Sequence, residues 1–346
     1  MTSRTPPASL LPWAEAVLTT DSPGGRATLS NVAGDASGRR YFRAIIQGRS
    51  YMLVHAPPAT EKNAAFLAAR DWLARAGLRV PEVFAADLEQ GFLLLEDLGD
   101  RTLLPALNEG SVDALYARAF DALQCLATAS IDDPRLAPYD AALLREELSR
   151  FDTWFLRGLL ARQPGARGSQ TCAELGEVLV ASALAQPRVL VHRDFHSRNL
   201  MLAPDGSLAV IDFQDAVAGP VTYDLVSLLR DCYIRWPEAK VTAWALDYRL
   251  RLRRAGCDAG EDEATFLRWF DLMGLQRHIK VLGTFARLAL RDGKTGYLED
   301  LPLVLDYVSV ILARYAPREP AIARFYNWYL AEIAPAVALE PWSAGA

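Results

Sequence analysis

Three polar side chains in one short stretch of the chain have types and a spacing that suit phosphoryl transfer. Asp194 and Asn199 lie in a single polar loop, and Asp212 comes near the end of the apolar run 208–213. A carboxylate can accept a proton, while an amide oxygen and a second carboxylate are ligands that Mg²⁺ prefers. Phosphoryl transfer depends mainly on such positioning and on charge neutralisation around the transferred group. This pattern therefore favours a site that holds a divalent cation and phosphates.

The elements around this loop have the pattern of strands. Apolar runs at 189–191 and 208–213 flank it, and Asp205-Gly206 is typical of a tight hairpin turn between 200–202 and the second run. A polar loop held between apolar strands is a common place for binding and catalytic residues. We therefore expect chemistry at this loop.

The first hundred residues predict mixed helix and strand. Apolar residues recur at helical spacing over 10–18 and 63–77, where Gly77 is a stop signal. Runs rich in β-branched and aromatic residues, separated by glycine-bearing turns, predict strands. The expected strands cover 26–34, 40–48, 50–56, 80–87 and 91–99. A sheet of about five strands with one crossing helix should result.

After Gly99 the periodicity becomes helical. Apart from the segment 189–216, the rest of the chain predicts helices joined by short loops. The expected helices cover 111–129, 139–160, 172–185, 242–256, 264–293, 301–314 and 318–333. The Arg/Pro/Gly-rich stretch 162–170 is expected to be a linker.

Composition narrows the class of protein. The 346 residues are 51% hydrophobic and 23% charged, which excludes a disordered chain and allows a sizeable core. A net charge of −5 argues against general nucleic-acid binding, and no apolar run is long enough to cross a membrane. The four scattered cysteines form no C-x-x-C pair and suggest free thiols in a reducing compartment. We expect a cytoplasmic protein with no obligate protein partner.

The polar loop carries a resemblance. His192-Arg193-Asp194 with Asn199, followed by Ile211-Asp212-Phe213, resembles the catalytic and metal-binding segments of the protein-kinase-like phosphotransferases, above all the aminoglycoside phosphotransferases and choline kinases. The resemblance implies an α+β, two-lobed protein-kinase-like fold. A small N-terminal lobe with an antiparallel sheet would cover 1–98, and a larger, mainly helical lobe would cover 99–346. It also implies ATP and Mg²⁺ as cofactors.

The same resemblance implies roles for individual residues. Asp194 would be the catalytic base, Asn199 and Asp212 would bind magnesium, and His192 would orient the loop. Asp224 matches an aspartate that braces the catalytic loop in such folds. An acidic residue in the first turn of a helix is equally consistent with a favourable helix dipole, so both readings of Asp224 stay open.

Nucleotide contacts are expected in the first hundred residues. The backbone from Glu96 to Leu98 should meet the adenine edge, and the loop 34–40, with Ser37 and Arg40, lies where a phosphate-covering loop would be. A plain turn is the alternative for that loop. The strand at 50–56 lacks the lysine that most relatives use on phosphates. Only four of the 37 basic residues are lysines, so Arg39, Arg40, Arg43, Lys62, or magnesium with backbone donors, must take that part.

A closer resemblance spans nearly the whole chain. The segments 35–43, 56–58, 228–233 and 275–288 resemble the bacterial anomeric N-acetylmuramate/N-acetylglucosamine kinases of cell-wall recycling. That family phosphorylates the anomeric hydroxyl with ATP and so supplies a sugar 1-phosphate for a nucleotide-sugar route. The resemblance implies a small amino-sugar substrate.

Candidate acceptor contacts lie in the helical region. Arg230, Arg277 and His278, with Lys280 beside them, could face the sugar, and a cation there could pair with a carboxylate on it. An ordinary solvated face or a helix cap is the alternative. Two other functions also remain open: phosphorylation of another hydroxyl, on an aminoglycoside or amino alcohol, and a catalytically inactive nucleotide-binding module.

Overall fold

The computed structural model describes residues 5–18, 27–32 and 38–345, and the chain packs as two compact units. The first unit contains Met1–Asn108 and Arg198–Asp215, and the second contains Glu109–Ser197 and Ala216–Ala346. The first unit reaches past the expected division at residue 98, and residues 99–108 and 198–215, which pair with each other, belong to it. The Leu103 N–H donates to the Leu200 carbonyl at 2.7 Å, and the Leu202 N–H donates to the Arg101 carbonyl at 2.8 Å.

An antiparallel five-stranded sheet forms the centre of the first unit. Its strand order is β1-β2-β3-β5-β4, which agrees with the predicted sheet of about five strands. The turn between β2 and β3 has Gln47 and Gly48 at φ +54° and +77°, the conformation that closes a two-residue hairpin. The strands are β1 (Thr28–Val32), β2 (Arg40–Ile46), β3 (Arg49–His55), β4 (Val83–Asp87) and β5 (Phe92–Glu96).

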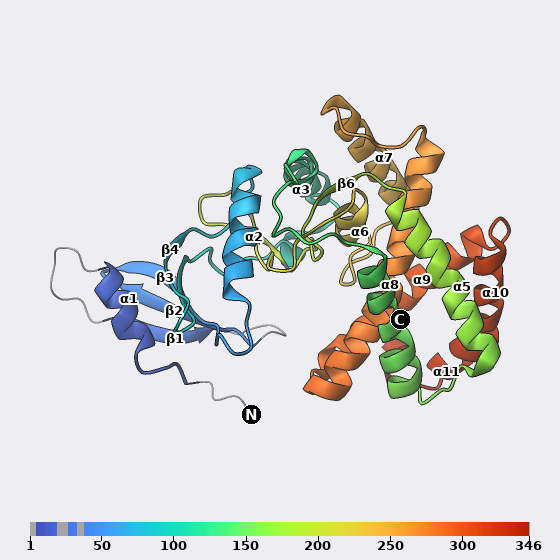
Figure 1. Cartoon of the computed structure of the whole chain (residues 1–346), viewed down its shortest axis with the longest axis horizontal. Helices are drawn as coiled ribbons and strands as arrows, with labels where there is room; N and C mark the ends of the chain where they lie inside the picture. Colours follow the sequence, from blue (N-terminus) through green and yellow to red (C-terminus); the bar gives the residue numbers. More distant parts are fainter. Residues whose placement is uncertain (1–4, 19–26, 33–37, 346) are drawn as a thin grey trace. The chain divides into compact units, whose positions relative to one another are not determined.

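One face of this sheet is covered by α1 (Leu10–Leu18), drawn in dark blue in Figure 1. Leu10 and Ala14 pack against Phe42 and Leu53, which point to the same face of their strands. The unit also contains α2 (Asn63–Arg75) and the short η1 (Leu104–Ala106). The predicted hairpin is present as β7 (Leu200–Leu202) and β8 (Leu208–Val210), with Gly206 at φ +82° in its turn.

The second unit is mainly helical. Its only strands within the described residues are the antiparallel pair β6 (Arg188–Val191) and β9 (Val217–Pro220). Two of its helical segments, η2 and η4, are π-helices. Its helices are α3 (Val112–Thr128), α4 (Ala141–Arg150), η2 (Phe151–Leu159), α5 (Gly165–Leu184), α6 (Tyr223–Leu229), α7 (Glu238–Arg254), α8 (Glu263–Asp292), η3 (Thr295–Asp300), α9 (Leu301–Tyr315), α10 (Pro320–Trp328), η4 (Tyr329–Ile333), α11 (Ala334–Val337) and η5 (Pro341–Gly345).

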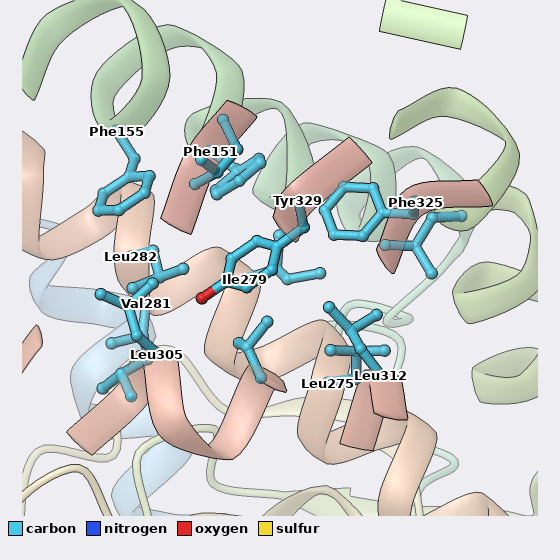
Figure 2. Close-up of a cluster of buried hydrophobic side chains, with 14 of the residues drawn as sticks. Phe151, Phe155, Leu275, Ile279, Val281, Leu282, Leu305, Leu312, Phe325 and Tyr329 are labelled. Carbon is cyan, nitrogen blue, oxygen red and sulfur yellow. The ribbon is translucent and has the colours of Figure 1, made fainter. Parts of the chain in front are cut away.

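The 30-residue helix α8 is the axis of this unit. The Asp262 side chain accepts the Thr265 N–H at 2.7 Å and caps its start, and Gly293 at φ +69° ends it. A Cβ at Gly283 would overlap the backbone at Arg150, so this glycine lets α4 approach closely. Ile279 packs among side chains from η2, α9 and α10 in the core shown in Figure 2. Burying each such aliphatic or aromatic side chain contributes roughly 1.5–3 kcal/mol.

The prediction of a linker over 162–170 is wrong in its second half, because α5 already begins at Gly165. Gly168 lies so close to Trp328 that a Cβ there would come within 2.8 Å of the ring, so the small residue serves helix packing instead of flexibility. The α+β class is confirmed by the sheet of the first unit and the helices of the second. Among the residues that the structure describes, none of the helices has the length and hydrophobicity of a membrane span.

Candidate functional site

A cavity of about 340 Å³ lies within the first unit. Most of its lining is apolar, with a few polar side chains at fixed positions, as is usual for sites that bind a planar ring and a polar group together. Its apolar lining includes Val32, Met52, Leu95, Leu98, Met201 and Ile211, and its polar lining includes Glu96, Asp100, Thr102, Arg198, Asn199 and Asp212.

The hairpin β7–β8 brings the two expected metal ligands together. Asn199 directly precedes β7 and Asp212 follows β8, and the Ile211 N–H donates to the Asn199 carbonyl at 3.0 Å. The Asn199 Nδ2 lies 3.4 Å from Asp212 Oδ2, and both side chains line the cavity. Asp212 adopts φ +65°, a conformation that is unusual for a residue with a side chain.

The donor set at this hairpin fits Mg²⁺. Gln214 Nε2 donates to Asp212 Oδ1 at 2.9 Å, and the buried Gln214 Oε1 has no hydrogen-bond partner. The described residues contain no cluster of three or more His, Cys, Asp or Glu side chains that could hold a metal by themselves. One carboxylate and amide oxygens suit an ion that keeps waters and binds phosphate oxygens, whereas zinc would need more protein ligands.

Glu96 and Leu98, the expected adenine contacts, both line the cavity. Glu96 ends β5, and Arg79 donates to its two carboxylate oxygens at 2.6 and 2.5 Å. The hydrogen bonds from Arg79 lower the pKa of Glu96. Leu98 is buried against Met201. The Glu96 carboxylate is thus bound by Arg79, and its backbone N–H donates to the Glu82 carbonyl at 2.9 Å.

The structure does not bring Arg40 to this cavity. Arg40 is the first residue of β2, and its guanidinium donates to the Thr5 carbonyl at 3.0 Å and contacts His55. Alternation along the strand places it with Phe42, on the face opposite Tyr41, which lines the cavity. The expected phosphate contact Ser37 lies outside the described residues.

In the second unit, Asp194 lies in the loop that follows β6, and Asp224 holds this loop. The Asp224 carboxylate accepts the backbone N–H groups of His192 at 2.6 Å and Arg193 at 3.0 Å. Burial raises the pKa of Asp224 to about 7, while these two hydrogen bonds act in the opposite direction. The Asp194 N–H in turn donates to His192 Nδ1 at 3.2 Å. These hydrogen bonds have the geometry expected if Asp224 holds the loop of Asp194 in place.

A second aspartate, Asp231, holds the end of the same loop, whereas the sequence suggested for it only a contact with the sugar or a helix cap. Asp231 Oδ2 accepts the Ser197 N–H at 2.9 Å and the Ser197 hydroxyl at 2.5 Å. Both residues are buried. Asp231 follows α6, the helix that begins at Tyr223, so the two ends of one short helix hold the two ends of the loop.

The surroundings of Asp194 are positively charged. Burial acts to raise the pKa of Asp194, but Lys280, His196 and Arg277 outweigh it and hold this pKa at about 2. The carboxylate is therefore ionised at neutral pH and can accept a hydrogen bond or a proton from a hydroxyl group.

A buried glutamate on α4 anchors two of the cations. Glu147 lies 3.0 Å from Lys280 Nζ and forms an ion pair with Arg193, and its side chain is fully buried. It also accepts hydrogen bonds from Tyr139 and, at 3.3 Å, from Gln276. Burial opposes ionisation, but Lys280 and Arg193 lower the pKa of Glu147 to about 2. The sequence analysis did not single out Glu147, although it shares the apolar face of its helix with buried Leu144.

The three expected acceptor contacts lie in different surroundings. Arg277 is buried and donates to Cys232 Sγ at 3.4 Å, and its charge acts on Asp194. His278 is fully buried and stacks on Tyr307, with ring centroids 4.8 Å apart. Burial and the neighbouring Arg277 lower the pKa of His278 to about 3. The structure therefore brings Arg277 to Asp194 but turns His278 to another part of the core.

Arg230 belongs to a buried ion-pair group. It is 1% exposed and donates to Asp271 Oδ1 at 2.7 Å and to Glu238 Oε1 at 2.8 Å. Arg314 binds the same two carboxylates. These ion pairs join α7, α8 and α9. The Arg230 carbonyl lies 3.0 Å from His278 Nε2.

Comparison with known proteins places this geometry among phosphotransferases. Residues 28–267 match the sequence model of the phosphotransferase enzyme family. The chain is 43% identical over 287 residues to an N-acetylmuramate/N-acetylglucosamine kinase of Pseudomonas putida, covering 83% of this chain and 84% of that protein. A kinase of the same name from Neisseria meningitidis is 40% identical, covering 85% and 89%. The resemblance expected from the motifs is confirmed.

Solved structures confirm the protein-kinase-like fold. An ADP-bound aminoglycoside phosphotransferase, APH(2'')-Ib, matches with a TM-score of 0.57 and 14% identity, over 88% of this chain and 98% of that chain. An ethanolamine kinase of Plasmodium vivax matches with a TM-score of 0.60 and 9% identity, over 82% of each chain. At such identities these neighbours show the fold alone.

Proposed function

The chain belongs to the phosphotransferase enzyme family, and we propose that it transfers the γ-phosphoryl group of ATP to the anomeric hydroxyl of N-acetylmuramate or N-acetylglucosamine. Its product would be a sugar 1-phosphate for peptidoglycan recycling. The names of relatives that are 40–44% identical over more than four fifths of both chains support this substrate class. The observation that carries the proposal is the set of cations around Asp194.

We assign nucleotide and metal binding to the cavity of the first unit. Its apolar walls suit an adenine ring, and the backbone from Glu96 to Leu98 supplies polar groups at its edge. Asn199 and Asp212 would hold Mg²⁺, with Gln214 orienting the Asp212 carboxylate through its hydrogen bond. When bound, the ion neutralises charge on the phosphate oxygens.

We assign the proton transfer to Asp194. Its carboxylate is ionised at neutral pH and accepts the proton of the attacking hydroxyl. Asp224 and Asp231 hold the loop from both ends, so the carboxylate needs no reorganisation before the transfer. His192, whose Nδ1 accepts the Asp194 N–H, fixes the turn of the loop between them.

The charge near Asp194 favours a neutral or anionic acceptor. Arg277, Lys280 and Arg193 all act on this carboxylate, and Glu147 offsets part of the charge of Lys280 and Arg193. A cationic aminoglycoside or amino alcohol would be repelled by such a group, whereas a carboxylate on a sugar would be attracted. This charge pattern separates the proposed substrate from the acceptors of other phosphotransferases that share the fold.

A coupled ADP-release assay over a panel of acceptors tests the proposal. We expect turnover with N-acetylmuramate and N-acetylglucosamine, and little with an aminoglycoside or choline. Phosphorus NMR of the product should show a sugar 1-phosphate. Turnover of an amino alcohol with both amino sugars inert would overturn the substrate, and nucleotide binding without turnover of any acceptor would indicate an inactive nucleotide-binding module.

A further inference from the structure

The lining of the cavity in the first unit carries more negative than positive charge. Among the described residues, the charged side chains that line it are Glu96, Asp100, Asp212 and Arg198. Three carboxylates and one guanidinium are a poor match for a polyphosphate. Strand β3 contains no lysine.

Three other arginines of this unit are held by contacts of their own. Arg43 makes hydrogen bonds of 2.5–2.9 Å to Asp97 and Asp100. Arg79 is bound by Glu96, and Arg40 lies on the other face of the sheet. None of these three is placed to give its charge to a phosphate in the cavity without breaking its present contacts.

Arg39 also pairs with a carboxylate, that of Glu61, but at 3.4 Å this contact is longer than the hydrogen bonds that hold Arg43 and Arg79. The Arg39 guanidinium lies 5.1 Å from the centroid of the Phe66 ring, and Phe66 lines the cavity. The Phe66 ring is 5.0 Å from the ring of Phe213, the residue directly after Asp212. One aromatic ring therefore links this buried guanidinium, only 4% exposed, to the wall that carries the metal-binding carboxylate.

Two features fix Arg39 on the cavity side of the sheet. It comes two residues before Tyr41, which lines the cavity, so alternation along the extended chain places both side chains on one face. Glu61 pairs with the guanidinium at 3.4 Å and accepts the Gly38 N–H at 3.0 Å. A Cβ at position 38 would lie 2.9 Å from this carboxylate, so Glu61 holds the backbone and the side chain together where the chain enters β2.

We propose that Arg39, held by Glu61 and Phe66, binds the phosphate groups of the nucleotide in place of a strand lysine. This inference rests on the nucleotide site of the proposed function. A guanidinium remains charged when it is buried, and its planar fork can bind two phosphate oxygens at once. The pair with Glu61 sets the direction of that fork before a nucleotide arrives.

Calorimetric binding of ADP, ATP and adenosine to full-length Arg39→Met tests this role. Methionine keeps an apolar chain against Phe66 and removes the charge. We expect the affinity for ADP and ATP to fall about 10- to 100-fold, the usual effect of losing a hydrogen bond to a charged group, while adenosine affinity stays the same. Arg39→Lys should restore part of the loss.

The matched control is Arg40→Met, which removes the neighbouring arginine, whose guanidinium lies on the face opposite Tyr41 and is bound by the Thr5 carbonyl. It should leave the ratio of ADP to adenosine affinity unchanged. Wild-type ADP affinity in Arg39→Met would overturn the inference, as would an equal loss for adenosine, which indicates a structural role. If the wild-type protein bound neither ADP nor ATP, the proposed function itself would fail.

Discussion

In the first unit the ion pairs beside the cavity reach solvent, whereas in the second unit a carboxylate and its cations are buried together. The side chains of Arg79 and Glu96 are 33% and 26% exposed. Glu147 is fully buried, and its partner Lys280 is 10% exposed. The first unit thus offers an apolar cavity edged by hydrated charges, and the second fixes a set of charges around one loop.

This difference predicts where substitutions should cost most. An exposed pair contributes about 0–1 kcal/mol, because water solvates either partner when the other is removed. Removing one partner of a buried pair leaves an uncompensated charge and costs about 3–5 kcal/mol. The comparison teaches that the loop of Asp194 is pre-organised by electrostatics, while the cavity of the first unit depends more on shape.

The largest effect should follow from Asp194→Asn. An amide cannot accept the proton of the hydroxyl, so kcat should fall about 10²- to 10⁴-fold. The affinity for ADP should be unchanged, since the cavity that we propose for the nucleotide belongs to the other unit. Steady-state kinetics and calorimetry measure the two quantities, and a variant that kept most of its turnover would contradict the role of Asp194.

Glu147→Gln should cause the largest loss of stability. It leaves Arg193 and Lys280 without their buried counter-charge, so the free energy of unfolding in urea should fall by about 3–5 kcal/mol. The neighbouring Glu146→Gln is the matched control, because Glu146 is exposed and pairs with Arg150 four residues away on the helix surface. A control loss of about 0.5 kcal/mol or less is expected. Equal losses in the two variants would break the comparison between buried and exposed pairs.

The stability that Glu147 provides should depend on pH. Its pKa is about 2 in the folded protein and near 4.5 in an unfolded chain. Because the folded-state pKa is depressed, the contribution is fully present above pH 4.5 and is lost as the pH falls toward 2. The difference in unfolding free energy between wild type and Glu147→Gln should therefore be constant from pH 6 to 8 and narrow between pH 4.5 and 3. A constant difference down to pH 3 would disprove the depressed pKa.

Gln214→Ala should weaken the proposed metal site of the first unit without unfolding it. Gln214 orients the Asp212 carboxylate, and losing such a partner typically costs 10- to 100-fold in metal affinity. A Mg²⁺ titration of ADP binding measures this directly. Gln90→Ala is the control, because Gln90 makes a similar bond, of 2.7 Å, to Asp87 on the surface. A Mg²⁺ dependence identical in both variants would remove Gln214 from the site.

Local pattern predicted much of this arrangement. The Asp205-Gly206 turn fixes the hairpin that brings Asn199 to Asp212, because all of these residues lie within 14 positions of one another. The helix expected over 10–18 has these bounds in the structure. Short-range periodicity and turn chemistry decide such elements, so a single sequence contains the information.

Long-range contacts explain what was missed. Glu147 acquires its role from Arg193 and Lys280, 46 and 133 positions away, and no local pattern reports that. The choice between Arg39 and Arg40 depends on which face of β2 carries the core, which α1 decides by packing on one side. Neighbouring residues of an extended chain point to opposite faces of the sheet, so Arg39 and Arg40 have different surroundings although they are the same residue type.

The smallest effect should follow from Arg79→Ala. Its guanidinium bonds to Glu96 are short, but both side chains are partly exposed, so the free energy of unfolding should fall by about 1 kcal/mol or less. The backbone bond from the Val210 N–H to the Arg79 carbonyl, at 2.8 Å, does not depend on the side chain. Because salt screens exposed charges, the loss should shrink in 1 M salt, whereas the loss in Glu147→Gln should persist. A loss of several kcal/mol in Arg79→Ala would show that the first unit also depends on a rigid charge network, and the contrast between the two units would disappear.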